Sequence, residues 1–140
     1  MTWRFLPYSL PLRIPYSWAK GTQRERLGLW VVREPDDGGL AGWGETAPPP
    51  HLGIPGQDLA FQAKAALEEA TDALELGAAL DAIGTEPRIR HGLLCAALDA
   101  QARAEGVPLA RLLARRHGIA RQPAAQVPVN ALVGAVPPAE

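Results

Sequence analysis

Three consecutive prolines, Pro48-Pro49-Pro50, place the strictest limit on how this chain can fold. Proline fixes φ and has no amide hydrogen to donate, so a strand that reaches Thr46 cannot continue through these residues, and a helix interior cannot contain them. Glycines and a further proline close the segment as far as Gly56. The sequence therefore predicts a stiff loop between a strand and a helix. It leaves open whether this loop binds a ligand or only connects two elements.

The residues before the loop predict three antiparallel strands. Residues 3–13 alternate loosely and contain two prolines, which favour an edge strand. Residues 26–34 are rich in Leu, Trp and Val, and a Pro-Asp-Asp-Gly-Gly turn joins them to a strand over residues 40–46. Residues 17–25 are polar and contain a glycine, so they predict a flexible loop between the first two strands.

The residues after the loop predict helices over residues 58–77, 78–83, 88–105 and 108–118. We expect Asp58 to cap the first helix and Gly77 to end it. Gly92, Ala96 and Ala100 recur at helical spacing and form a face of small residues, which lets a neighbouring element approach closely. The predicted fold class is α+β, a three-stranded antiparallel meander followed by a helical bundle.

Composition excludes several classes of protein. The net charge of −1 over 140 residues argues against a nucleic-acid partner, and no apolar run approaches the ~20 residues that cross a membrane. The amino terminus lacks the apolar segment of a signal peptide, so we expect a cytoplasmic protein of one main domain.

The single cysteine, Cys95, cannot form an internal disulfide and has apolar neighbours typical of a core. The three histidines lack the spacing of metal ligands.

Residues 42–48, Gly-Trp-Gly-Glu-Thr-Ala-Pro, resemble the "GWGE-x-(A/S)-P" strand end in the N-terminal capping domain of the enolase superfamily. The resemblance is strongest to o-succinylbenzoate synthase and its muconate-lactonizing-like relatives. Further pieces match the family in the same order, at residues 8–12, 26–31, 95–100, 106–113 and 127–133. The resemblance implies a capping domain over residues 1–122. Residues 123–140 would be a linker and the first strand of a β/α barrel whose remaining strands are missing from this sequence.

The family reaction, as the resemblance implies, removes a proton next to a carboxylate while a Mg²⁺ ion stabilises the enediolate. The metal-binding carboxylates and the lysine acid/base groups of the family lie on later barrel strands. We therefore expect no catalytic residue, no metal site and no bound cofactor in this chain. Glu45 would order the neighbouring loop, and activity would need the barrel, in cis or from another chain.

Two loops of the family domain cover the barrel mouth, exclude water and contact the distal part of the substrate. They correspond to residues 14–26 and 47–56 of this chain. The resemblance makes these residues the substrate-binding candidates: Trp18, Lys20, Thr22, Arg24, Pro50, His51, Leu52 and Ile54. Basic residues outnumber the single acid, Glu25, in and beside the first loop, which suits an anionic small molecule but is also typical of a solvated loop.

We therefore expect the capping, substrate-specificity domain of an o-succinylbenzoate-synthase-like enzyme, a lyase that forms 2-succinylbenzoate for menaquinone biosynthesis. On this view the sequence is a fragment or a truncated gene product that is inactive alone. One alternative is the capping domain of a dipeptide epimerase or another muconate-lactonizing-like enzyme. Another alternative is a non-catalytic α+β binding or assembly module. In that module the apolar run 127–133 would pair with a second copy to form a homo-oligomer.

Overall fold

A computed structural model describes residues 2–18, 21–36, 38–49, 52, 54–69 and 76–120, together with Gln126 and Pro128. Its elements are, in order, β1 (Thr2–Trp18), β2 (Gly21–Glu34), β3 (Gly42–Thr46), α1 (Gly56–Glu69), α2 (Leu76–Ala82), α3 (Pro87–Ala104) and α4 (Leu109–Arg116). The predicted α+β meander followed by helices is confirmed. The predicted strand over residues 127–133 lies outside the described residues, so the domain boundary and the homo-oligomer stay predictions.

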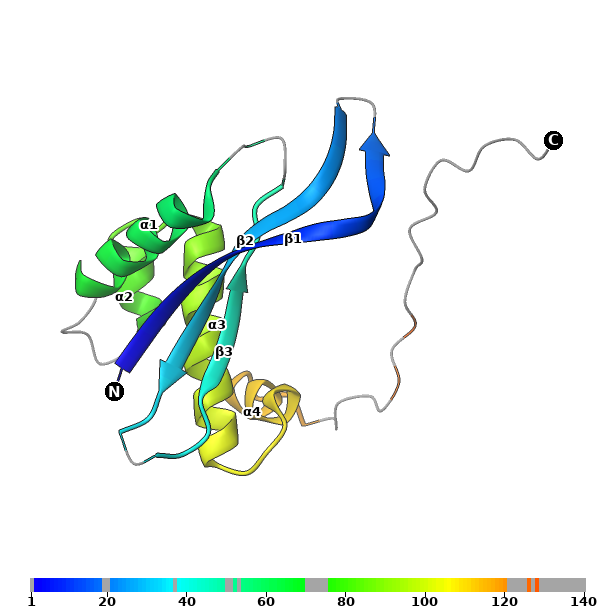
Figure 1. Cartoon of the computed structure of the whole chain (residues 1–140). Helices are drawn as coiled ribbons and strands as arrows, with labels where there is room; N and C mark the ends of the chain where they lie inside the picture. Colours follow the sequence, from blue (N-terminus) through cyan, green and yellow to red (C-terminus); the bar gives the residue numbers. More distant parts are fainter. Residues whose placement is uncertain are drawn as a thin grey trace.

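The sheet is antiparallel with the order β1-β2-β3, so β1 is an edge strand, as its prolines predict. The helices α1, α2 and α3 lie on one side of it (Figure 1). Alternate residues of β2, Leu29 and Val31, point toward these helices and are fully buried. The core between sheet and helices consists of Leu29, Val31, Leu59, Ala63, Leu80, Ile89, Leu93 and Ala96.

The prediction of a flexible polar loop over residues 17–25 is wrong. Strands β1 and β2 stay paired almost to the tip, where Tyr16 lies opposite Gln23 and Ser17 opposite Thr22. The hydroxyl oxygens of Ser17 and Thr22 lie 2.9 Å apart and form a cross-strand hydrogen bond. This ribbon is exposed to solvent, so its polar residues resemble those of a loop. The strand register is irregular between Pro11 and Tyr16, where the ribbon leaves the main sheet.

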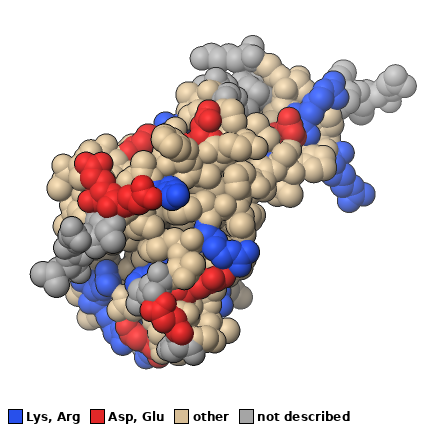
Figure 2. All heavy atoms as spheres, turned by 60° about the vertical axis from the view of Figure 1, so that its left-hand side comes forward, with Lys and Arg blue, Asp and Glu red and all other residues tan. Residues whose placement is uncertain are grey.

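We call residues 12–18 and 21–25 the arm. The arm extends past the helices in Figure 1, at the upper right. Figure 2 shows Lys and Arg side chains toward the end of this projection. Arg13 and Arg24 are exposed there, beside the one acid of the arm, Glu25. The predicted positive excess therefore lies on a projecting ribbon.

Strand β3 packs directly on helix α3, backbone against backbone. A Cβ atom added at Gly44 would overlap the carbonyl oxygen of Gly92, and one at Gly42 would overlap that of Ala96. Gly92 is equally constrained, because a Cβ there would overlap the hydroxyl of Thr46. This contact confirms the predicted face of small residues and explains why alternate positions of β3 carry no side chain.

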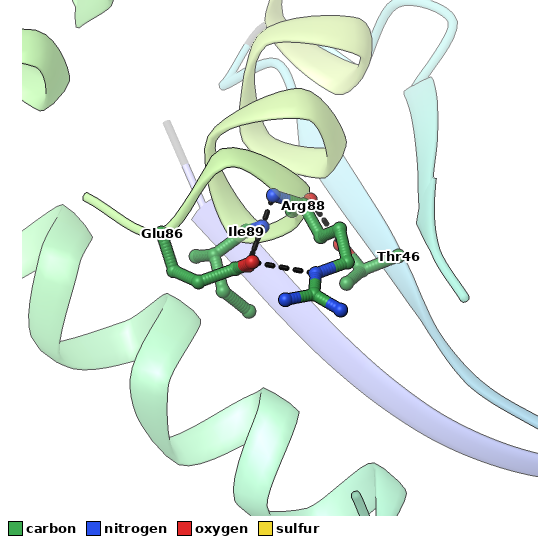
Figure 3. Close-up of polar contacts among 4 residues, drawn as sticks. All are labelled: Thr46, Glu86, Arg88 and Ile89. Atoms are coloured by element: carbon green, nitrogen blue, oxygen red, sulfur yellow. Dashed lines mark hydrogen bonds and ion pairs between the residues drawn. The ribbon is translucent and has the colours of Figure 1, made fainter. Parts of the chain in front are cut away.

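The amino terminus of α3 is capped by Glu86 and tied to the end of β3 (Figure 3). The Glu86 carboxylate accepts hydrogen bonds from the amides of Arg88, at 2.9 Å, and Ile89, at 3.2 Å. Burial alone would raise the pKa of Glu86, but the Arg88 guanidinium and the two amides together hold it below its usual range. Thr46 Oγ1 donates to the Arg88 carbonyl at 3.0 Å, which fixes the end of β3. We call residues 47–56, which follow this strand, the proline segment.

Two predicted ends of helix α1 are wrong. The helix begins at Gly56, because the Pro55 carbonyl accepts the amides of Asp58 and Leu59 and leaves Asp58 within the first turn. Gly56 is buried against the Gly28 carbonyl, so tertiary contact selects the starting point. Gly77 lies within the first turn of α2 and ends no helix. Gly118, with φ of +63°, does end α4 as predicted, since the Ile119 amide donates to the Ala114 carbonyl at 2.8 Å.

Candidate functional site

A pocket of about 310 Å³ lies between the arm and the proline segment. Its walls combine polar residues of the arm with apolar residues of the proline segment and of β2. The lining consists of Thr22, Gln23, Arg24, Glu25, Leu27, Pro48, Pro49 and Ile54. The two segments predicted to cover a reaction chamber therefore meet and enclose a shared space, although they are more than twenty residues apart in sequence.

The structure brings together three of the predicted substrate-binding residues, Thr22, Arg24 and Ile54, in this pocket. Leu52 is 41% exposed and is not part of the lining. Trp18 is the last residue of β1, but its side chain lies outside the described part of the chain. Lys20, Pro50 and His51 also lie outside the described residues, so their predicted roles stay predictions.

Arg26 has a positioning role that the sequence does not indicate. Its Nη2 donates to the Ala47 carbonyl at 2.8 Å, and its Nη1 reaches the Pro48 carbonyl at 3.5 Å. Pro48 has no amide hydrogen to donate to a neighbouring strand, and the Arg26 guanidinium supplies donors to the carbonyls of Ala47 and Pro48. Arg26 thus links the base of the arm to the proline segment. In the sequence it is only one of several basic residues near the arm.

Tyr8 and Glu45 hold the end of β3 from the other side of the sheet. The Tyr8 hydroxyl donates to Glu45 Oε1, and the Tyr8 side chain crosses β2 at Gly28, where a Cβ atom would overlap it. Burial, and then the hydrogen bond and charge of Glu45, raise the pKa of Tyr8 to about 12. Glu45 therefore anchors the strand that leads into the proline segment, in line with the ordering role that the family resemblance implies.

An aromatic row continues across this open face of the sheet. The rings of Tyr8 and Trp30 lie 5.4 Å apart, and those of Trp30 and Trp43 lie 6.4 Å apart in a T-shaped arrangement. Trp43 remains 47% exposed. The row stabilises the open face of the three-stranded part of the sheet, because such aromatic pairs stabilise beyond the area they bury.

The described residues do not fit a metal ion. Within them, no three His, Cys, Asp or Glu side chains lie together as ligands. Mg²⁺ needs oxygen ligands in near-octahedral geometry, so we derive no metal-dependent step from this part of the chain. None of the helices in the described ranges is both long and apolar enough to cross a membrane.

Cys95 is half-buried on α3, and its Sγ lies 3.5 Å from Nε2 of His91. Burial raises the pKa of the Cys95 thiol, and the charge of Asp99 raises it further. A thiol needs a lowered pKa to act as a nucleophile near neutral pH. The raised pKa does not favour a thiolate at Cys95, and its half-buried position differs from the core position that its apolar neighbours in the sequence predict.

No protein-family model matches the chain, and no curated protein matches it. Solved structures do match it. One match is a dipeptide epimerase from Cytophaga hutchinsonii, complexed with Mg and the dipeptide D-Ala-L-Val, with a TM-score of 0.67 and 18% sequence identity. The similarity covers 79% of this chain and 32% of the epimerase chain. An enolase family member from Agrobacterium tumefaciens with homology to dipeptide epimerases has a TM-score of 0.66 and 19% identity over 87% of this chain and 35% of its own.

A mandelate racemase/muconate lactonizing protein from Herpetosiphon aurantiacus is 26% identical, with a TM-score of 0.61 over 74% of this chain and 31% of its own. The chain thus spans about a third of the length of the structures it matches. These similarities do not single out o-succinylbenzoate synthase among the superfamily's activities. The three-stranded meander and the helices that follow it have the fold of the N-terminal capping domain of enolase-superfamily enzymes.

Proposed function

We propose that this chain closes the active site of an o-succinylbenzoate-synthase-like enzyme and contacts the distal part of its substrate. One observation carries the proposal: the arm and the proline segment meet in a pocket that contains Thr22, Arg24 and Ile54. The proline segment is anchored by Arg26, and the strand before it is anchored by Tyr8 and Thr46. A capping domain needs such anchoring, because a mobile lid would lose entropy each time it closes.

The pocket offers an anionic substrate with an apolar body one guanidinium and an apolar wall, and the carboxylate of Glu25, which also lines it, accepts a hydrogen bond from Ser9. Arg24 provides a guanidinium that pairs with a carboxylate, and Thr22 provides a hydroxyl. Leu27, Ile54 and the prolines provide an apolar wall against which a ring can pack. The product 2-succinylbenzoate carries two carboxylates and an aromatic ring, so it matches both surfaces. We propose that Trp18, Lys20, Pro50, His51 and Leu52 extend the same binding surface.

Proton transfer and Mg²⁺ binding belong, in this proposal, to a β/α barrel, in cis or on another chain. The described residues provide no ligand set for the ion, so the contribution of this chain is to bind, orient and exclude water. Exclusion of water from the active site strengthens every electrostatic interaction within it. The chain alone is then expected to give no turnover.

The second candidate is the capping domain of a dipeptide epimerase. The observation that favours it is the fold similarity, at a TM-score of 0.67, to the epimerase solved with Mg and D-Ala-L-Val. A dipeptide also carries a terminal carboxylate, which Arg24 could hold in the same way. The two candidates therefore differ in the reaction and share the binding pocket.

The experiment begins with the coding sequence downstream of Glu140. An in-frame Lys-x-Lys segment followed by spaced acidic strand ends would identify the parent enzyme class. The complete protein is then assayed with Mg²⁺ for dehydration to 2-succinylbenzoate and for epimerisation of L-Ala-L-Glu. Dehydration supports the synthase, and epimerisation alone supports the second candidate. The absence of a barrel sequence would favour the non-catalytic module and overturn both.

The substrate role of the pocket is tested in the complete protein with Arg24→Gln. We expect KM to rise about tenfold or more, because a charge-assisted hydrogen bond to the substrate is lost. Arg13→Gln, an equal charge change at an exposed position of the arm outside the lining, is the control and should change KM less than about twofold. Equal effects of the two substitutions would show general attraction and no pocket contact.

A further inference from the structure

The open face of the sheet carries connected polar side chains at the point where the arm leaves the packed strands. Alternate residues of β2 face opposite sides, and Leu29 is buried beneath the helices, so Arg26 and Gly28 lie on the open face. Tyr8 of β1 lies opposite Gly28 in the register, and Leu10 lies opposite Arg26. Tyr8 and Arg26 are therefore diagonal neighbours on this face, a separation that an aromatic and a long side chain can bridge.

The Tyr8 side chain spans the sheet from its first strand to its third. A Cβ atom at Gly28 would overlap the Tyr8 ring and hydroxyl, so the ring crosses β2 only because this residue has no side chain. The hydroxyl donates to the carboxylate of Glu45 on β3. The ring also packs against that of Trp30, with the centroids 5.4 Å apart. One side chain therefore connects all three strands.

Arg26 extends this connection to the proline segment. Its Nη2 donates to the Ala47 carbonyl at 2.8 Å, and its Nη1 reaches the Pro48 carbonyl at 3.5 Å. The same guanidinium acts on Tyr8. Burial, and then Glu45, raise the pKa of Tyr8 to about 12, whereas the charge and a hydrogen bond of Arg26 act in the opposite direction. A tyrosine hydroxyl accepts from one group while it donates to another, so both contacts are compatible.

The contacts form a closed ring. The Glu45 side chain and the Ala47 carbonyl belong to residues two apart in the sequence. Tyr8 and Arg26 connect the two groups a second time, across the open face of the sheet. Hydrogen bonds joined in this way polarise one another, so the loss of one member weakens the others. Pro48, the next residue along the chain, accepts from the ring and lines the pocket beside the arm.

We propose that Tyr8 and Arg26 act together as positioning residues, which fix Pro48 at the wall of the pocket and so set how well the distal group of a substrate fits. Neither residue belongs to the lining, so each acts through the proline segment and not by contact with a ligand. The effect on position concerns this chain alone. The effect on a substrate rests on the proposed capping function.

The position is tested by amide hydrogen exchange at Leu52, measured by NMR in the 140-residue chain. The Leu52 amide donates to the Pro49 carbonyl at 3.1 Å, so its exchange rate reports whether the proline segment keeps its shape. Tyr8→Phe removes the hydroxyl and keeps the ring, and exchange should become about threefold faster or more. Arg26→Met removes the donors to both carbonyls, and exchange should become about tenfold faster or more. Unchanged exchange in either variant would overturn the proposal.

Arg4→Gln is the matched control. Arg4 lies on the same face of the sheet, opposite Val32 in the register, and forms an ion pair with Glu34 at 2.8 Å, remote from the arm. The substitution removes one charge and one ion pair but leaves the ring intact, so exchange at Leu52 should change less than about twofold. An acceleration as large as that of Arg26→Met would show that a general loss of stability controls Leu52 and would refute the positioning role.

The double variant Tyr8→Phe/Arg26→Met tests whether the two side chains form one unit. In a closed ring either substitution alone breaks the connection, so the second adds little. The combined acceleration at Leu52 should therefore stay well below the product of the two single effects. An acceleration equal to that product would show two independent anchors and contradict the ring.

The effect on a substrate is tested in the complete protein. Tyr8→Phe and Arg26→Met should each raise KM severalfold and leave kcat within about twofold, because neither side chain touches the reacting atoms. An unchanged KM in a protein that turns over its substrate would overturn the inference about substrate fit. A complete protein without either activity would count against the proposed function alone, since the exchange experiment needs no substrate and still decides the positioning role.

Discussion

The two ends of the β1–β2 pair are built differently, although the strands are continuous. Beneath the helices, Leu29 and Val31 are fully buried, and β3 meets α3 backbone to backbone. In the arm, Ile14 is 78% exposed, and the strands are joined by ladder bonds and the Ser17–Thr22 contact. One end therefore has stability from packing against the helices, whereas the arm depends chiefly on cross-strand contacts.

This difference suits the proposed role of the domain as a lid. A two-stranded ribbon is marginal in water by itself, so the arm keeps its shape because its base belongs to a packed sheet. The residues that contact the pocket can then vary without loss of the core. Substitutions at the base should reduce stability strongly, and those in the arm should leave it nearly unchanged.

Gly44→Ala tests the packed end of the sheet and should have the largest effect on stability. The added Cβ overlaps the Gly92 carbonyl, so β3 and α3 must separate, and we expect a loss of about 3 kcal/mol or more in the free energy of unfolding. Urea unfolding followed by circular dichroism measures it. Gly77→Ala is the control: its Cβ meets Leu94 at an ordinary 3.6 Å within α2, so stability should stay equal or rise slightly. Similar losses in both variants would contradict the close-packing argument.

Glu86→Ala tests the cap that ties α3 to the end of β3. We expect a loss of about 1–2 kcal/mol near neutral pH, because two helix amides lose their acceptor. The pKa of Glu86 is lowered in the folded chain, so its contribution is present above the unfolded pKa and disappears as the pH falls below about 4. Unfolding measured from pH 7 to pH 3 should show the two proteins converging. A constant difference over this range would exclude an ionised cap.

Ser17→Ala tests the cross-strand contact of the arm and should have the smallest effect on stability. The exposed hydroxyl pair is worth less than about 0.5 kcal/mol, but its loss should speed amide hydrogen exchange in the arm and leave the core unchanged. Ser17→Thr keeps the hydroxyl and should restore the slower exchange. A global loss of stability in Ser17→Ala would show that the arm and the core unfold as one unit.

The sequence predicted the elements whose burial is periodic. The strand of residues 26–34, the strand end at Thr46 and the small-residue face of α3 are all confirmed, because each reflects contact with a core. The arm was missed, since a ribbon exposed on both faces has no apolar period. The start of α1 was misplaced by two residues, because Gly56 meets β2 through a tertiary contact that local patterns do not encode.

In the candidate site, too, some residues could be predicted from the sequence and others could not. Family resemblance pointed to Thr22, Arg24 and Ile54, which line one pocket. The role of Arg26 was not predictable, because its acceptors are backbone carbonyls 21 and 22 residues away in the chain.

Arg26 carries one further consequence. Because a single side chain joins the second strand to the carbonyls of Ala47 and Pro48, displacement of the ribbon pulls the proline segment with it. The guanidinium therefore couples the base of the ribbon to the residues that follow β3, so a change in the position of one is transmitted to the other.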